Sequence, residues 1–287
     1  PTYMDKTGRN GLRLGDIIRT DFMKRYNQLK SKHTDILEQH NYKYNIEQHE
    51  KDWFKGLEIL KEFTLIDSEY EINKFIDEDK KILAEGAQGS LLDIDFGSYP
   101  FVTSSSTVCA GACIGLGISP QKIGNVLGIF KAYCTRVGSG PFPTELHNEV
   151  GQKLRDKGNE YGSTTGRPRR CGWLDLVALK YAVMLNGITS LIMTKADVLD
   201  SFETIKVATA YKVNGKETNE IPFDIDADIE PIYKEFKGWN SPIINAKSNA
   251  DLPKELLNYI SFIEKETGVP VSIVSVGPER SATVLRG

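Results

Sequence analysis

An arginine-rich loop is the part of this sequence whose residue types are best suited to chemistry. Residues 163–170 read Ser-Thr-Thr-Gly-Arg-Pro-Arg-Arg, so three guanidinium groups and three hydroxyls stand in eight positions. Arginine is always charged and offers a planar fork of donors to carboxylate or phosphate. Gly166 frees the backbone, so that hydroxyls and N–H groups can complete the coordination of an anion. The loop is predicted to bind a small dicarboxylate or a phosphate; the alternative is a solvated basic turn.

A second candidate is the tetrapeptide Thr194-Lys195-Ala196-Asp197, which follows an apolar run. It matches the N/TKxD pattern of guanine recognition. There the carboxylate accepts hydrogen bonds from guanine N1–H and the exocyclic amino group, and the lysine stem packs along the base. Adenine does not present these donors, so a site built this way discriminates against it by roughly 10⁴ or more. Taken alone, the tetrapeptide is a weak signal, because most chance occurrences of this pattern are surface loops.

Two further polar residues stand where a ligand could reach them. Gln88 lies between two small residues at the end of an expected strand, where its amide can both donate and accept. Thr103 precedes a run of serines and an expected helix, where hydroxyls and free N–H groups could meet a phosphate. An ordinary helix cap is the alternative for Thr103. Asp93 and Asp95 are expected on one face of an extended segment, in a structural role rather than as a metal or acid–base pair.

The composition narrows the functional class. The 287 residues carry a formal net charge of −3, which argues against a broad nucleic-acid footprint, so the local arginines indicate a small-anion site. No apolar run approaches the roughly 18 residues needed to span a membrane. The four cysteines lack a zinc or redox spacing, and the four histidines are scattered. These features predict a cytoplasmic enzyme without nucleic-acid or membrane partners.

The elements expected to position these residues alternate between strands and helices. Strands are predicted at 81–85, 122–129, 190–194, 204–211 and 271–276, and helices at 107–115, 173–185 and 253–267. Interleaving of this kind predicts one α/β domain over 1–287, with a mainly parallel central sheet flanked by helices. Residues 21–80 are expected to form a helical subdomain, with an apolar stripe of Phe54, Leu57, Ile59, Leu60 and Phe63. Three of the strands end next to candidate ligands, as is typical of parallel sheets.

Together, these motifs resemble the adenylosuccinate synthetase family. The loop 163–170 is similar to the family's aspartate-binding loop, and ten further segments follow in the family's order: 85–89, 92–95, 99–100, 102–105, 131–133, 135–138, 140–145, 158–160, 194–197 and 275–278. The resemblance covers the carboxy-terminal two-thirds of the enzyme. It implies a P-loop-NTPase-like architecture without its first segment. It also implies GTP-dependent ligation of L-aspartate to IMP, giving adenylosuccinate, GDP and phosphate, the first committed step of AMP synthesis.

The resemblance also assigns residues to ligands. For IMP they are Arg9, Gln88, Thr103 and Arg167. For aspartate they are Ser163, Thr164, Thr165, Gly166, Arg167 and Arg169. For GTP they are Arg169, Lys195, Ala196, Asp197, Ser275, Val276 and Gly277. Arg9 is expected to reach the site of the neighbouring subunit, which makes a homodimer part of the active site.

The parts that perform phosphoryl transfer are not recognisable in the sequence. No G-x-x-x-x-G-K-[ST] pattern or glycine-rich relative occurs in the 287 residues. The family's catalytic acid and base and its Mg²⁺ ligands are therefore expected upstream of Pro1, and the chain alone is expected to be inactive. The alternative is a catalytically silent nucleotide-binding or dimerisation protein derived from the synthetase.

Overall fold

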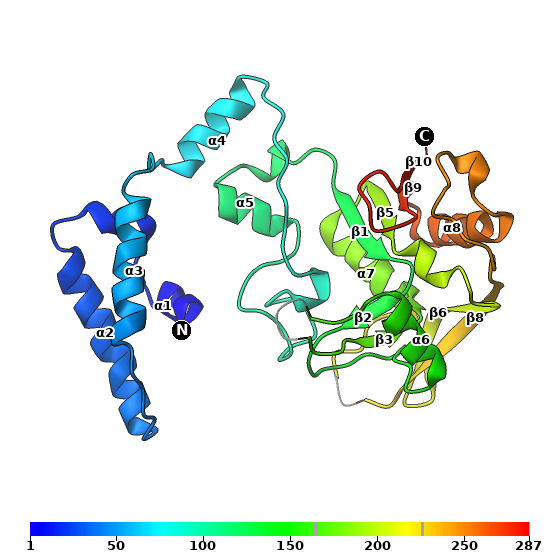
Figure 1. The fold of residues 1–287 in the computed structure, drawn as a ribbon, viewed down its shortest axis with the longest axis horizontal. Helices are drawn as coiled ribbons and strands as arrows, with labels where there is room; N and C mark the ends of the chain where they lie inside the picture. Colours follow the sequence, from blue (N-terminus) through cyan, green and yellow to red (C-terminus); the bar gives the residue numbers. More distant parts are fainter. Residues whose placement is uncertain (163–165, 225–226, 287) are drawn as a thin grey trace. The chain divides into compact units, whose positions relative to one another are not determined.

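The computed structural model describes residues 1–162, 166–224 and 227–286. The chain divides into two compact units, Pro1–Ile82 and Leu83–Gly287, which are described separately (Figure 1).

The first unit is helical. It contains α1 (Thr2–Thr7), a 3-10 turn (Leu14–Ile18), α2 (Phe22–Gln39), α3 (Glu47–Leu60) and α4 (Ser68–Asp77), in agreement with the helices expected between residues 21 and 80. Its small core consists of Ile17, Phe22 and Leu57. The expected apolar stripe is only partly correct, since Ile59 and Phe63 are 57% and 64% exposed. The buried cluster takes up one narrow face of α3, and Phe63 lies beyond the end of that helix.

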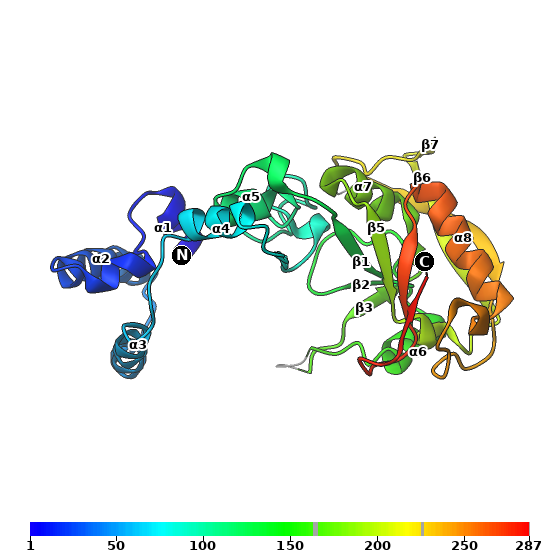
Figure 2. The ribbon, with the colours of Figure 1, turned by 90° about the horizontal axis from the view of Figure 1, so that it is seen from above.

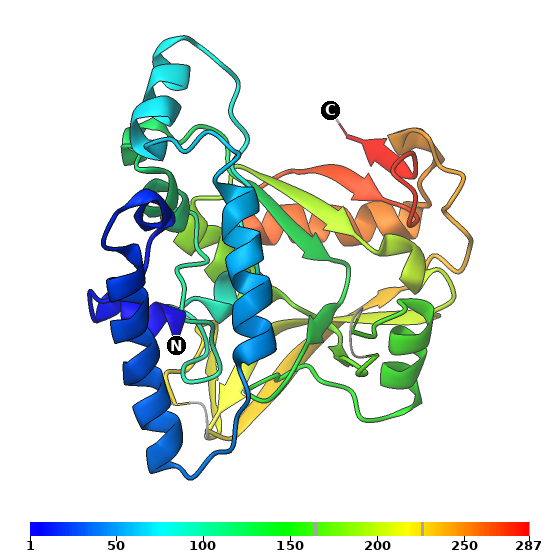
Figure 3. The same ribbon diagram turned by 60° about the vertical axis from the view of Figure 1, so that its left-hand side comes forward.

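The second unit is built on a sheet with the strand order β1-β5-β9-β10. Strands β1 (Leu127–Lys131), β5 (Ser190–Thr194) and β9 (Val271–Ser275) are parallel, and β10 (Thr283–Leu285) closes the edge antiparallel to β9. Figure 3 shows the arrows of β1 and β5 pointing the same way. The mainly parallel central sheet is thus confirmed. Alternate residues of β5 enter the core, where Leu191 and Met193 are fully buried.

A second sheet, largely antiparallel, was not predicted. In it β6 (Thr204–Val213) pairs antiparallel with β7 (Lys216–Thr218) and with β8 (Ile229–Lys237), while β4 (Leu174–Asp175) pairs parallel with β6. Asn214 and Gly215 both have positive φ and form the two-residue turn between β6 and β7. Asn-Gly is the residue pair that this hairpin turn favours, because both positions need a left-handed backbone.

The second unit has four helices among its described residues. They are α5 (Ala110–Leu116), α6 (Glu149–Lys157), α7 (Leu176–Asn186) and α8 (Lys254–Thr267), with short 3-10 turns at Ser90–Leu92, Pro120–Lys122, Ala196–Leu199 and Asn249–Asp251. Of these helices, α6, α7 and α8 contact strands. A separate two-stranded antiparallel sheet is formed by β2 (Cys134–Arg136) and β3 (Arg170–Gly172). Figure 2 shows α8 running along the sheets. Tyr259 of α8 contacts the ring of Phe236 in β8 edge-on. The Tyr259 hydroxyl donates to the carbonyl of Ala132, just beyond the end of β1.

Two predicted strands need correction. Residues 81–85 form no strand in the described structure. The apolar pair Ile82-Leu83 suggested a buried strand, but Leu83 is 85% exposed and pairs with no neighbouring strand. The strand expected from residue 122 begins only at Leu127, because Pro120–Lys122 is a 3-10 turn. No helix of the described residues is both long and apolar enough to cross a membrane.

Candidate functional site

A cavity of about 1000 Å³ opens in the second unit, at the upper end of the usual size range for small-molecule sites. Its wall is formed by the segment 88–100, by β1 and β2, by the start of α7 and by residues 221–224. The predicted IMP contact Gln88 and the predicted aspartate contact Arg169 both lie in this wall. Lys131 and Arg136 add two cations to the wall, which also contains the carboxyl groups of Asp95, Asp175 and Asp224.

Arg169 is held by a buried carboxylate that the sequence analysis had not assigned. The Glu160 side chain is 1% exposed, and its Oε2 accepts a hydrogen bond of 2.7 Å from Arg169 Nη1. Its Oε1 accepts hydrogen bonds of 2.6 Å from Lys131 Nζ and from the Tyr133 hydroxyl. Burial raises the pKa of Glu160, but the hydrogen bonds from Lys131 and Tyr133 outweigh it and leave the pKa below its ordinary value.

Only part of the predicted aspartate-binding loop lies in the described structure. Ser163, Thr164 and Thr165 fall outside the described residues. Gly166 has a φ of +64°, in the left-handed region that favours glycine, and its N–H donates to the carbonyl of Gly162. The carbonyl of Arg167 accepts from the N–H of Gly162, which closes the loop. These backbone contacts hold the described flanks of the loop together, and Arg169, two residues further on, lines the cavity.

The TKAD segment begins with Thr194, the last residue of β5, so the motif stands at the carboxyl end of that strand. The backbone of Lys195 adopts the left-handed conformation, with a φ of 62°. Its Nζ donates a 2.7 Å hydrogen bond to the carbonyl of Gly158. Ala196 is fully buried and begins the 3-10 turn that carries Asp197. Partial burial of the Asp197 carboxyl raises its pKa above the ordinary value. A carboxylate that has lost part of its hydration in this way gains from the N–H donors of a ligand.

The segment after β9 forms a compact turn. The Ser275 hydroxyl donates to the carbonyl of Gly277 at 3.0 Å, and the buried Val276 donates its N–H to the carbonyl of Ala282. A Cβ on Gly277 would lie 3.1 Å from side-chain atoms of Ala282 and Ile244, so the position is tight for a larger residue.

Two acidic residues behave differently from the expectation that they share a face. Asp93 is buried and accepts hydrogen bonds from the backbone N–H groups of Asp95, Phe96, Thr107 and Val108, which confirms a structural role for it. Asp95 is exposed, because the chain turns after Asp93 instead of remaining extended. Thr103 is half-buried in the same loop system, and its N–H donates to the carbonyl of Leu92.

The structure brings together some of the predicted residues and leaves others apart. Of the described residues, those that line the cavity include Gln88 and Arg169, but not Thr103, Gly166, Arg167, the TKAD segment or residues 275–277. Arg9 belongs to the first unit, so its part in the site stays a prediction. Lys131 and Glu160 lie in segments that carried the family resemblance, yet the sequence alone indicated no role for them.

The comparisons with known proteins agree with these motifs. The family model described as "Adenylosuccinate synthetase" matches residues 1–284. The chain is 58% identical over 286 residues to the adenylosuccinate synthetase of Parabacteroides distasonis. The match covers 100% of this chain and 67% of the length of that relative. The relative from Cytophaga hutchinsonii is 57% identical over 289 residues, with the same coverage.

The solved structures agree as well. The fully ligated adenylosuccinate synthetase from Plasmodium falciparum has a TM-score of 0.92 and 38% identity, over 100% of this chain and 69% of that one. The succinoaminodeoxyadenylate synthetase of cyanophage S-2L shares the fold alone. It is 18% identical, with a TM-score of 0.51, and the match covers 79% of this chain and 52% of that one. The chain therefore belongs to the adenylosuccinate synthetase family.

Proposed function

We propose that this chain provides most of the substrate contacts of a GTP-dependent ligase that joins L-aspartate to IMP. In the proposed reaction the γ-phosphoryl group of GTP passes to O6 of IMP, and the aspartate amine then displaces phosphate to give adenylosuccinate. The observation that carries the proposal is the cavity wall shared by Gln88 and Arg169. It joins a polar amide suited to a base with a guanidinium suited to a carboxylate.

The proposal gives each predicted group a part in binding. Arg167 bridges IMP and aspartate, and Arg169 holds an aspartate carboxylate close to GTP. Gln88 and Thr103 bind IMP. Lys195, Asp197 and the 275–277 turn form the guanine pocket, supported by the position of Lys195 and Asp197 directly after β5. Because the Lys195 ammonium is tied to Gly158, its stem is held in one direction, as packing along a base requires.

The metal and the proton-transfer groups are assigned outside this chain. Within the described residues, no cluster of three or more His, Cys, Asp or Glu side chains is placed to hold a metal ion. The proposal places the Mg²⁺ ligands and the catalytic acid and base in the part of the relatives that this chain does not cover. It also includes the homodimer in which Arg9 enters the partner's site, and a cytoplasmic location.

Nucleotide preference tests the guanine assignment. In the full-length gene product, Asp197→Asn should lower kcat/KM for GTP relative to ATP on the order of tenfold or more, because the amide cannot accept both guanine donors. Asp200→Asn is the matched control. Its carboxylate is also partly buried, but it accepts from Trp239 Nε1 and from the N–H of Ile243, so this variant should leave the ratio unchanged. An unaltered ratio in Asp197→Asn would place the base elsewhere.

A further inference from the structure

The buried carboxylate of Glu160 has no place in the proposed function as it stands. We propose that Glu160 is a positioning residue, which holds Arg169 and Lys131 in the cavity wall and so prepares the binding site for the carboxylates of aspartate. The inference rests on the proposed function for the identity of the ligand. Its geometrical part rests on contacts within this chain alone.

The contacts show that Glu160 acts through its neighbours. Its carboxylate is 1% exposed, whereas the side chains of Lys131 and Arg169 are 25% and 33% exposed and lie in the cavity wall. A ligand in the cavity therefore has access to the two cations, with the carboxylate behind them. Both carboxylate oxygens are occupied, since Oε1 accepts from Lys131 and Tyr133 and Oε2 accepts from Arg169.

The charges explain why such a residue is needed. Lys131 and Arg169 would repel each other if they stood together without a carboxylate, and desolvation already lowers the pKa of Lys131 while Glu160 raises it. One carboxylate between two cations leaves a net charge of about +1, which can attract an acidic ligand. The Nε of Arg169 is buried and has no hydrogen-bond partner among the described residues. Buried polar groups are normally paired, so the hydrogen bonding of Arg169 is incomplete among the residues that the structure describes.

The backbone around Glu160 keeps its place independently of the carboxylate. The N–H of Arg169 donates to the carbonyl of Glu160 at 2.9 Å, and Tyr161 bridges to Pro168 in the same antiparallel arrangement. Two residues earlier, the carbonyl of Gly158 holds the Lys195 ammonium. Substitution of the Glu160 carboxylate should therefore change the orientation of the Lys131 and Arg169 side chains and leave the backbone pairing between residues 160–161 and 168–169 intact. An effect on binding can then be distinguished from a loss of folding.

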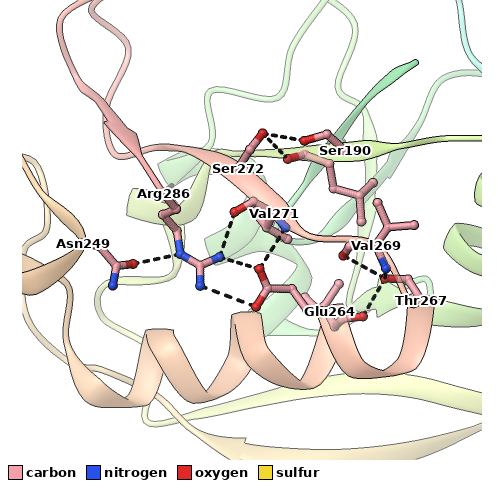
Figure 4. Close-up of polar contacts among 10 residues, drawn as sticks. Ser190, Asn249, Glu264, Thr267, Val269, Val271, Ser272 and Arg286 are labelled. Carbon is pink, nitrogen blue, oxygen red and sulfur yellow. Dashed lines mark hydrogen bonds and ion pairs between the residues drawn. The ribbon is translucent and has the colours of Figure 1, made fainter. Parts of the chain in front are cut away.

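Three variants of the full-length gene product test the assignment. Glu160→Gln keeps the shape and removes the charge. Glu160→Asp keeps the charge but shortens the reach. Glu264→Gln is the matched control. Glu264 also binds an arginine, Arg286 at 2.8 Å, and accepts from the N–H of Val271, at a place outside the cavity (Figure 4).

Steady-state kinetics give the first readout. For Glu160→Gln we expect the aspartate KM to rise about tenfold or more and the IMP KM to change by less than about twofold, with a smaller rise for GTP. Glu160→Asp should be intermediate, and Glu264→Gln should retain all three values. A fall in kcat with every KM unchanged, or equal effects in Glu160→Gln and Glu264→Gln, would overturn the inference.

A second readout keeps the two proposals separable. An NMR signal of the Arg169 guanidinium, assigned by its loss in Arg169→Lys, should be protected from solvent exchange in the wild type and unprotected in Glu160→Gln. If the wild type made no adenylosuccinate, the proposed function would fail, and this signal would still decide the position of Arg169. An Arg169 signal with the same protection in Glu160→Gln as in the wild type would refute the role of Glu160.

Discussion

Replacement of Gly158 by alanine tests the packing behind the site most sharply. Gly158 follows α6 with a φ of −77° and a ψ of −7°, which alanine adopts without strain. A Cβ there would lie 2.1 Å from the Tyr133 hydroxyl and 2.8 Å from the backbone carbonyl of Leu154. The variant must therefore move Tyr133, whose hydroxyl donates to Glu160 at 2.6 Å.

The magnitude follows from these two effects. Overpacking of a dense interior costs about 1–3 kcal/mol, and loss of a hydrogen bond to a charged group costs about 1.5–3 kcal/mol. Because a shift of Tyr133 relieves part of the clash, Gly158→Ala should lower the free energy of unfolding by about 2–5 kcal/mol. Gly115→Ala, in α5 with no atom within 4 Å of the added methyl, should instead be stabilising, by about 0.5–1 kcal/mol.

Urea denaturation followed by tryptophan fluorescence measures both variants, read from the midpoint at an unchanged m value. In a Tyr133→Phe background the hydroxyl is gone, so Gly158→Ala should cost clearly less than it does in the wild type. Additive effects of the two substitutions, or a Gly158→Ala protein as stable as the wild type, would refute the contact between Gly158 and Tyr133.

The remaining predictions concern the binding residues and the buried carboxylate. Arg167→Leu should raise the aspartate KM and impair the use of IMP, because it removes the guanidinium proposed to bridge the two substrates; unchanged kinetics would remove this loop from the site. Arg9→Ala mixed with a subunit inactivated elsewhere should recover some activity, and dimers without recovery would count against a shared site. The lowered pKa of Glu160 means that its contribution to stability is present above about pH 4.5 and is lost as the pH falls towards the folded-state value. Glu160→Gln should flatten that part of the pH–stability curve, measured by urea midpoints; an unchanged curve would show that Glu160 titrates normally.

The sequence pattern predicted those helices and strands whose identifying features lie within a single continuous segment. The strand at 190–194 and the helix ending at residue 267 match β5 and α8 because their apolar spacing and flanking glycines are contained in the segment. The antiparallel pairing of β6 with β8 depends on partners far apart in the sequence, and was missed. The Asn214-Gly215 pair was the available signal for the adjoining β6–β7 hairpin.

The candidate site also contains residues that could be predicted from the sequence and one that could not. Gln88 and Arg169 could be proposed from their motifs, and the structure places both in the cavity wall. The part played by Glu160 could not be read in this way, because it depends on Lys131 and Tyr133, which precede it by nearly thirty residues. A lone glutamate in a loop has an ordinary solvated interpretation until its burial and partners are known.

The most direct test of the central proposal is magnesium-dependent formation of adenylosuccinate by the full-length gene product from IMP, L-aspartate and GTP. Each substrate is omitted in turn as the control. We expect product only when all three are present, with release of GDP and phosphate in equal amounts. An absence of product while IMP or GTP still binds would contradict the ligase proposal and indicate a silent nucleotide-binding protein.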